Sequence, residues 1–201
     1  MKKKRRIPFS TVYLALGLVI IYLPIALVIL YSFNESKLSS VWGGFSLKWY
    51  RTLFADKAMF QALGNSLILG LSASFAAGVV GTLGAVGFDR VRPRSRRVIE
   101  YLPSLPLMTP EIILGMVFMA FFGMLGIPFG MGTLILSHTT FCIPYVFMLV
   151  QARLVGMDRS LAEAARDLGA GERQVFFTIT LPLLLPAIVS GMLLSFAMSL
   201  D

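Results

Sequence analysis

The chain is organised around one stretch, Glu163-Ala164-Ala165-Arg166-Asp167-Leu168-Gly169, followed after nine residues by Ile179-Thr180-Leu181-Pro182. This stretch is a polar segment between two strongly apolar ones. Its small residues, its glycine and its spacing predict a short helix, a glycine break and a second short helix. In a chain dominated by apolar segments, such a loop indicates a docking surface for a soluble partner and not a membrane span.

The composition excludes a soluble globular fold. Hydrophobic residues make up 57% of the 201 residues and charged residues only 14%, whereas soluble proteins average about 25% charged residues. The mean hydropathy is +0.80. Five stretches approach the roughly 20 apolar residues that cross a bilayer as a helix, namely residues 11–32, 62–88, 99–122, 133–150 and 183–200. The sequence therefore predicts an all-α, polytopic transmembrane bundle that forms a single domain over residues 1–201.

The basic residues predict the orientation of this bundle, because Lys and Arg are retained on the cytoplasmic side. Fourteen of the 18 Lys and Arg lie within residues 2–6, 90–97 and 153–173. We therefore expect a cytoplasmic N-terminus, a periplasmic segment over about residues 33–61 and a cytoplasmic loop over about residues 153–182. The formal charge of +8 also suits nucleic-acid binding. Topology and contact with anionic membrane lipid explain these clusters better, so no nucleic-acid partner is expected.

Smaller features of the spans and loops give further expectations. Aromatic and basic residues within 45–60 predict a short helix on the outer membrane face. Small residues at four-residue spacing, beginning at Gly70, Ser74 and Gly78, predict close helix packing. The lone Cys142 permits no intrachain disulfide and argues against a metal site. The lone His138 is expected to form an interhelical hydrogen bond.

The polar loop also has local signals for the ends of its first helix. Ser160 and Glu163 fit a capping box, in which each side chain bonds the backbone amide of the other residue. Gly169 suits the left-handed position that ends a helix. On this interpretation Glu163 stabilises the helix and need not touch a partner.

Two acids are candidates for a membrane pathway. Glu111 lies about eleven residues into the third apolar stretch, roughly 16 Å deep, where an ionised carboxylate is costly unless it faces a pathway or a cation. Pro110 can begin a new half-helix at this point, whose amides would stabilise the carboxylate. The alternative is a protonated or internally satisfied Glu111. Asp201 is the second candidate, with a surface residue as its alternative, and two such acids would favour a dication.

The docking stretch resembles the signature loop of the permease subunits of bacterial ABC importers, in which E-A-A, three residues, G, nine residues and I-x-L-P follow one another. All seven fixed positions are present: Glu163, Ala164, Ala165, Gly169, Ile179, Leu181 and Pro182. Tyr31-Ser32-Phe33-Asn34, Thr109-Pro110-Glu111-Ile112 and Ser199-Leu200-Asp201 look like segments of putrescine and spermidine permeases. In that family the acids of the substrate path correspond to Glu111 and Asp201.

This resemblance implies an inner-membrane subunit that forms half of a polyamine path and couples to a separate ATPase through the docking loop. The implied partners are a second permease in a heterodimer, two ATP-binding ABC subunits and a periplasmic polyamine-binding protein. No catalytic residue, cofactor or metal is implied. The family usually has six spans, and five crossings would leave Asp201 outside, so a C-terminal truncation that removes the sixth span is expected. A permease for another solute, or an ATP-independent secondary transporter or channel, remains the alternative.

Overall fold

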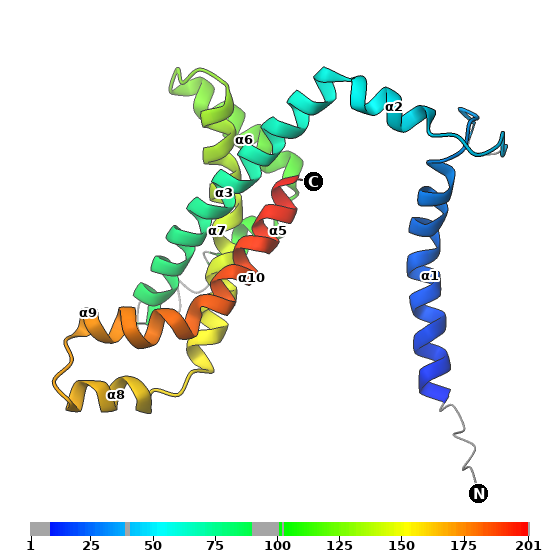
Figure 1. Ribbon diagram of the computed structural model, residues 1–201. Coiled ribbons are helices and arrows are strands. Elements are labelled where there is room, and N and C mark those ends of the chain that lie inside the picture. Colours follow the sequence, from blue (N-terminus) through cyan, green and yellow to red (C-terminus); the bar gives the residue numbers. More distant parts are fainter. Residues whose placement is uncertain (1–8, 39–40, 90–100, 102, 201) are drawn as a thin grey trace, which may run out of the picture. The chain divides into compact units, whose positions relative to one another are not determined.

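The computed structural model describes residues 9–38, 41–89, 101 and 103–200, which form helices joined by short connections (Figure 1). Within this part of the chain there is no strand, only an isolated antiparallel bridge between Asn34 and Phe45. The prediction of an all-α fold is confirmed. The chain divides into two compact units, Met1–Gln61 and Ala62–Asp201, which are described in turn.

The first unit contains a membrane-length helix and a folded loop. Helix α1 spans Phe9–Tyr31, and none of its side chains is buried within the first unit. The loop after it is organised by Asn34, which is 1% exposed. The Asn34 amide donates to the Val41 carbonyl (2.7 Å) and accepts from the Gly43 amide (2.7 Å). Helix α2, Lys48–Ala55, confirms the expected short helix, and its Trp49 indole donates to the Asn34 carbonyl (2.8 Å).

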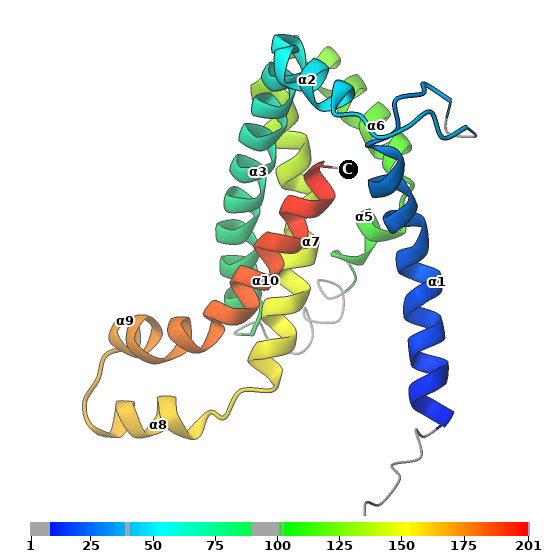
Figure 2. The ribbon, with the colours of Figure 1, turned by 45° about the vertical axis from the view of Figure 1, so that its right-hand side comes forward.

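In the second unit, three long helices pack side by side (Figures 1 and 2). They are α3 (Lys57–Asp89), α7 (Met131–Val155) and α10 (Leu181–Leu200). At their centre Val146 of α7 is fully buried. A Cβ atom at Gly81 of α3 would lie 2.8 Å from the Val146 Cβ, and one at Gly191 of α10 would lie 3.0 Å from the Val146 Cα. Glycine at both positions therefore permits the close approach that the small-residue pattern predicted.

Polar groups also join α7 to α10 across the buried interface. The Cys142 thiol donates to the Ser195 carbonyl (3.5 Å), and the Ser195 hydroxyl donates to the Cys142 carbonyl (3.4 Å). Both residues are fully buried. Cys142 is free, so its role is in packing. Reciprocal bonds of this kind satisfy polar groups that lipid cannot hydrate.

The third predicted span does not form one continuous helix. In its described part, helix α5 (Ser104–Met108) ends before Thr109, and helix α6 (Glu111–Met124) begins after Pro110. Proline has no backbone N–H, and it keeps the residue before it out of the helical conformation. Thr109 is accordingly extended, with φ −90° and ψ 130°. Pro110 caps α6 and does not occupy its first turn.

Among the described residues, four helices are long and apolar enough to cross a membrane: Phe9–Tyr31, Lys57–Asp89, Met131–Val155 and Glu172–Leu200. They contain the first, second, fourth and fifth predicted stretches, apart from Ser32. With 14 residues, α6 reaches about 21 Å, less than the roughly 30 Å of a hydrocarbon core. The number of crossings therefore stays a prediction.

Candidate functional site

The docking stretch forms a helical hairpin at one end of the bundle of the second unit (Figures 1 and 2). Its first arm is α8, Ser160–Asp167. Its second arm is α9, Glu172–Val175, which continues into the π-helical segment η1, Phe176–Thr180. The two arms run side by side in opposite directions and are joined by the loop that contains Gly169. The hairpin confirms the predicted first helix and the glycine break after it.

Gly169 ends α8 in the left-handed conformation, with φ +87°. The Gly169 amide donates to the Arg166 carbonyl (2.8 Å), and the Ala170 amide donates to the Ala165 carbonyl (3.0 Å). These two bonds form a Schellman motif, which satisfies carbonyls at the end of the helix. The predicted role of Gly169 as a helix terminator is confirmed.

The predicted capping box is wrong. The Glu163 amide donates to the Arg159 carbonyl (3.1 Å) and not to Ser160. The Ser160 amide donates to a carboxylate oxygen of Asp158 (2.9 Å), two residues earlier. This bond, with a second from the Ser160 hydroxyl, lowers the pKa of Asp158 below its ordinary value. An ionised acid before α8 also suits the positive end of the helix dipole, so Asp158, and not Ser160, supplies the side-chain acceptor at the start of α8.

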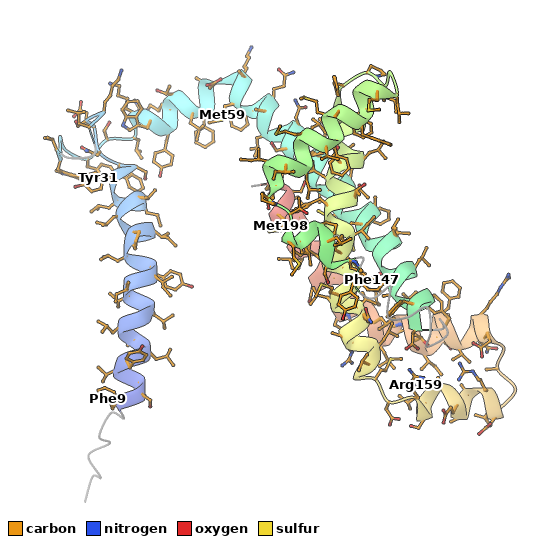
Figure 3. All side chains as sticks on the ribbon, turned by 180° about the vertical axis from the view of Figure 1, so that it is seen from behind. Phe9, Tyr31, Met59, Phe147, Arg159 and Met198 are labelled. Atoms are coloured by element: carbon orange, nitrogen blue, oxygen red, sulfur yellow. The ribbon has the colours of Figure 1, made fainter. Side chains whose placement is uncertain are left out.

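The hairpin is tied to itself and to the bundle by exposed ion pairs. Arg166 of α8 binds Glu172 of α9 through both carboxylate oxygens, at 2.5 and 3.4 Å. Arg159 binds Asp89, at the end of α3, at 3.1 and 3.3 Å. Exposed pairs contribute little stability, so these two pairs are not what holds the hairpin folded. Arg159 marks the beginning of the hairpin in Figure 3.

The second arm of the hairpin is continuous with the last long helix, Glu172–Leu200. This differs from the prediction of a separate second helix. In η1 the Leu181 amide bonds the Phe176 carbonyl, five residues back. Pro182 follows directly and has no N–H for the Thr178 carbonyl, so a regular α-helical ladder is interrupted here. Figures 1 and 2 show the helix bending where η1 meets α10, as expected at a π segment or a proline.

The signature residues occupy different parts of the hairpin. Glu163 lines a groove of about 290 Å³ between the hairpin and the ends of α3 and α7. Ala164 is exposed, Ala165 is half-buried and Gly169 is in the turn. Ile179 and Leu181 are half-buried at the bend, and Pro182 there is exposed.

The outer face of α8 is apolar and uncovered in the described chain. Leu161 is 52% exposed and Leu168 is 89% exposed. They are seven residues apart, so they lie on one face of the helix together with Ala164. If the hairpin lies outside the membrane as predicted, an uncovered apolar face of this kind is typical of an interaction surface. The predicted docking surface therefore has an apolar component.

A second site lies where α6 begins. Glu111 is the first residue of α6, and it lines a cavity of about 210 Å³ between α6, α7 and α10. Leu114, Phe118, Phe141 and Met198 form the apolar part of this cavity. Met198, labelled in Figure 3, lies at the end of α10 far from Arg159 and the hairpin. The structure thus brings the predicted acid to a cavity at a helix break.

His138 of α7 forms the expected interhelical hydrogen bond, between its Nδ1 atom and the Ser199 hydroxyl of α10 (2.9 Å). It also lines the same cavity as Glu111. Sequence reasoning missed this, since the two residues are 27 positions apart on different helices. Asp201, the other predicted acid, lies outside the described residues.

The helices of membrane length form a bundle with a helical hairpin at one end. An acid lines a cavity where a helix is broken. Together these features define a membrane transport protein. A profile of the family described as "Binding-protein-dependent transport system inner membrane component" matches residues 77–201. The chain is 43% identical over 203 residues to the putrescine transport system permease protein PotI of Escherichia coli strain K12, covering 98% of this chain and 72% of the relative.

Two further comparisons agree with this match. The spermidine/putrescine transport system permease protein PotC of Haemophilus influenzae is 40% identical over 181 residues, covering 90% of this chain and 70% of PotC. Among solved structures, a bacterial ABC transporter involved in the import of the acidic polysaccharide alginate matches with a TM-score of 0.72 and 18% identity, over 94% of this chain and 69% of that one. The chain belongs to the family of inner-membrane permease components of binding-protein-dependent transport systems.

Proposed function

We propose that the chain is a permease subunit of an ATP-driven polyamine importer and forms part of the membrane path for putrescine or spermidine. The relatives named for these substrates support the proposal. The observation that carries it is the Glu111 carboxylate in the wall of the cavity between α6, α7 and α10. A carboxylate at a helix break, in largely apolar surroundings, is a favourable partner for an organic cation. Asp201 is proposed as a second acid of the path.

The proposed assembly contains a second permease, two ATP-binding subunits and a periplasmic polyamine-binding protein. None of the six lysines of this chain follows a glycine, so it has no phosphate loop of the G-x-x-x-x-G-K-S/T type. ATP hydrolysis is therefore assigned to a partner. The hairpin, with exposed Leu161 and Leu168, is its proposed docking site. In this topology the N-terminus and the hairpin are cytoplasmic and residues 33–61 are periplasmic.

Uptake of radiolabelled putrescine and spermidine tests the substrate. Cells without their own polyamine importers would receive the whole assembly, or the assembly without this chain. We expect uptake only when this chain is present. If uptake does not depend on the chain and another solute is taken up instead, the polyamine assignment is wrong.

Replacement of Glu111 by Gln tests whether this carboxylate is part of the polyamine path through the membrane. Gln keeps the size of the side chain but removes the charge that binds the cation. A hydrogen bond to a charged group contributes about 1.5–3 kcal/mol, so we expect uptake to fall by roughly tenfold or more. Glu111→Asp keeps the charge and should retain more uptake than Glu111→Gln. Equal uptake by wild type and Glu111→Gln, in equally assembled complexes, would remove Glu111 from the path.

Replacement of Leu168 by Glu tests the docking surface. A charge on the apolar face of α8 should prevent burial against a partner, so the ATP-binding subunit should be lost when the complex is purified in detergent. Leu38→Glu is the matched control, because Leu38 is similarly apolar and 65% exposed but lies in the loop after α1. Retention of the ATP-binding subunit by Leu168→Glu would contradict docking through this face.

A further inference from the structure

The cavity that Glu111 lines has a second polar residue of a different kind. His138 projects from α7 into its lining, and the cavity is several times larger than a single water requires. Phe118 and Phe141 also line it. The Phe118 ring stacks on that of Phe122 (6.3 Å between centroids), and the Phe141 ring contacts that of Tyr145 (5.5 Å). The aromatic walls are therefore held by their own helices.

The hydrogen bond to Ser199 determines which ring nitrogen of His138 is available. Among the described residues, Ser199 is the hydrogen-bond partner of the ring, and the bond uses Nδ1. The donor in this bond is Nδ1 or the Ser199 hydroxyl, depending on the tautomer of the ring. In the neutral tautomer that carries its proton on Nδ1, the Ser199 hydroxyl accepts that proton and Nε2 is unprotonated. Ser199 is 6% exposed, so this arrangement is shielded from bulk water.

We propose that His138 carries its proton on Nδ1 and is a specificity-determining residue of the cation site, whose Nε2 accepts an N–H bond from an ammonium group of the substrate while Ser199 fixes the ring. This inference rests on the proposed function and extends it. An ammonium group has three donors and no acceptor, so Glu111 alone leaves donors without a partner. A neutral imidazole supplies another acceptor without adding a charge.

The remaining walls agree with a primary amine on an alkyl chain. Aromatic faces attract ammonium groups, and Phe118, Phe141, Leu114 and Met198 offer apolar surface for methylene groups. A site for an inorganic cation would instead need several oxygen ligands. No cluster of three or more His, Cys, Asp or Glu side chains suited to a metal occurs in the described chain.

Two isosteric substitutions separate substrate binding from packing. Asn places its amide near Nδ1, so His138→Asn keeps the bond to Ser199 and removes the group at Nε2. Gln reaches the position of Nε2, so His138→Gln keeps an acceptor in the cavity and loses the bond to Ser199. The measurement is the initial rate of putrescine uptake into proteoliposomes containing the whole complex, at saturating putrescine and binding protein.

We expect His138→Asn to lower the uptake rate about tenfold, and His138→Gln to lower it by less than about threefold. Ser199→Ala removes the hydrogen-bond partner of the His138 ring and should lower the uptake rate by an intermediate amount. Thr140→Ala is the control on α7, because its hydroxyl donates to the Leu136 carbonyl of its own helix (2.8 Å). Each complex is first checked for equal subunit content by gel filtration.

A higher uptake rate for His138→Asn than for His138→Gln would overturn the inference. If His138 only packs, His138→Asn keeps the bond between α7 and α10 and should be the milder change. Equal rates for wild type and His138→Asn would also overturn it. Either result leaves the proposed function intact, because the wild-type complex still transports putrescine. Absence of putrescine uptake by the wild type would instead contradict the proposed function.

Discussion

Gly169 adopts a backbone conformation that other residues enter only at a cost. Its φ of +87° would cost an L-residue about 1–2 kcal/mol, although a Cβ atom would meet no neighbour within 4 Å. We expect Gly169→Ala to open the end of α8 more often and to speed amide exchange at Ala170 by roughly 5- to 30-fold. Hydrogen exchange followed by mass spectrometry measures this.

Gly171 provides the matched control for that substitution. It lies in the same turn but has a φ of −69°, and a Cβ atom there would also meet no neighbour within 4 Å. Gly171→Ala should therefore leave exchange in α8 unchanged. The same acceleration in both variants would show that the left-handed conformation is not the cause.

Asp158 gives the start of α8 a dependence on pH. Its pKa lies below the ordinary value of 3.8, because the Ser160 amide and hydroxyl bond the carboxylate. A lowered pKa means that the stabilisation is complete above about pH 4–5 and is lost as the pH falls through the folded-state pKa. We expect protection of the Ser160 amide to be constant from neutral pH to about pH 5 and to fall below pH 4.

Asp158→Asn separates this effect from general acid unfolding. The Asn side chain keeps an oxygen acceptor but does not titrate in this range, so the pH dependence of Ser160 exchange should disappear. Exchange rates measured by NMR or mass spectrometry decide the question. An unchanged pH dependence in Asp158→Asn would assign it to another group.

At the scale of the elements, Gly81 tests the packing of the three long helices. A Cβ atom there would lie 2.8 Å from the Val146 Cβ and 3.1 Å from the Ile143 carbonyl oxygen and the Phe147 amide nitrogen. Backbone atoms cannot move aside as a side chain can, so overpacking should exceed the gain in helix propensity. We expect Gly81→Ala to destabilise the bundle by about 1–3 kcal/mol, seen as a lower midpoint of thermal unfolding in detergent.

Gly87 is the control for Gly81 in the same helix. A Cβ atom there meets no described residue within 4 Å, and replacing a helical glycine by alanine gains about 0.5–1 kcal/mol of helix stability. Gly87→Ala should thus be neutral or stabilising. Equal destabilisation by both substitutions would contradict the close approach of α3 and α7 at Gly81.

The helices were largely predictable because their signals are local. A run of apolar residues predicts a membrane helix, and Pro110 predicts the break before α6. The start of α3 at Lys57 was missed by five residues, since Gln61, Lys57 and Asp56 carry no apolar signal. The acceptor at the start of α8 was also missed: Asp158 lies two residues before the helix and Ser160 is its first residue, and only the backbone geometry selects between their oxygens.

The site was predictable only in part. The spacing from Glu163 to Pro182 predicts the hairpin, since its signals lie within one continuous segment. The cavity needs α6, α7 and α10 to pack together, so the proximity of His138 and Glu111 has no sequence pattern. The π segment Phe176–Thr180 is likewise a compromise between the missing N–H of Pro182 and continuity of the helix. No residue pattern specifies it alone.

On the scale of the second unit, a single continuous helix connects its two sites. The helix Glu172–Leu200 carries the second arm of the hairpin at one end. Near its other end it carries Met198, which lines the cavity, and Ser199, which binds His138. Helices are stiff along their axes, so a movement of the hairpin would be transmitted toward the cavity, with η1 as the place to bend. This arrangement suits an importer driven from one side of the membrane.

The most direct test of this account is ATP-driven accumulation of radiolabelled putrescine in proteoliposomes that contain the complete complex with this chain. The account predicts accumulation that requires ATP, requires this chain and is strongly reduced by Glu111→Gln. Putrescine accumulation that proceeds equally well without ATP, or an active complex that accumulates another solute and no polyamine, would contradict it.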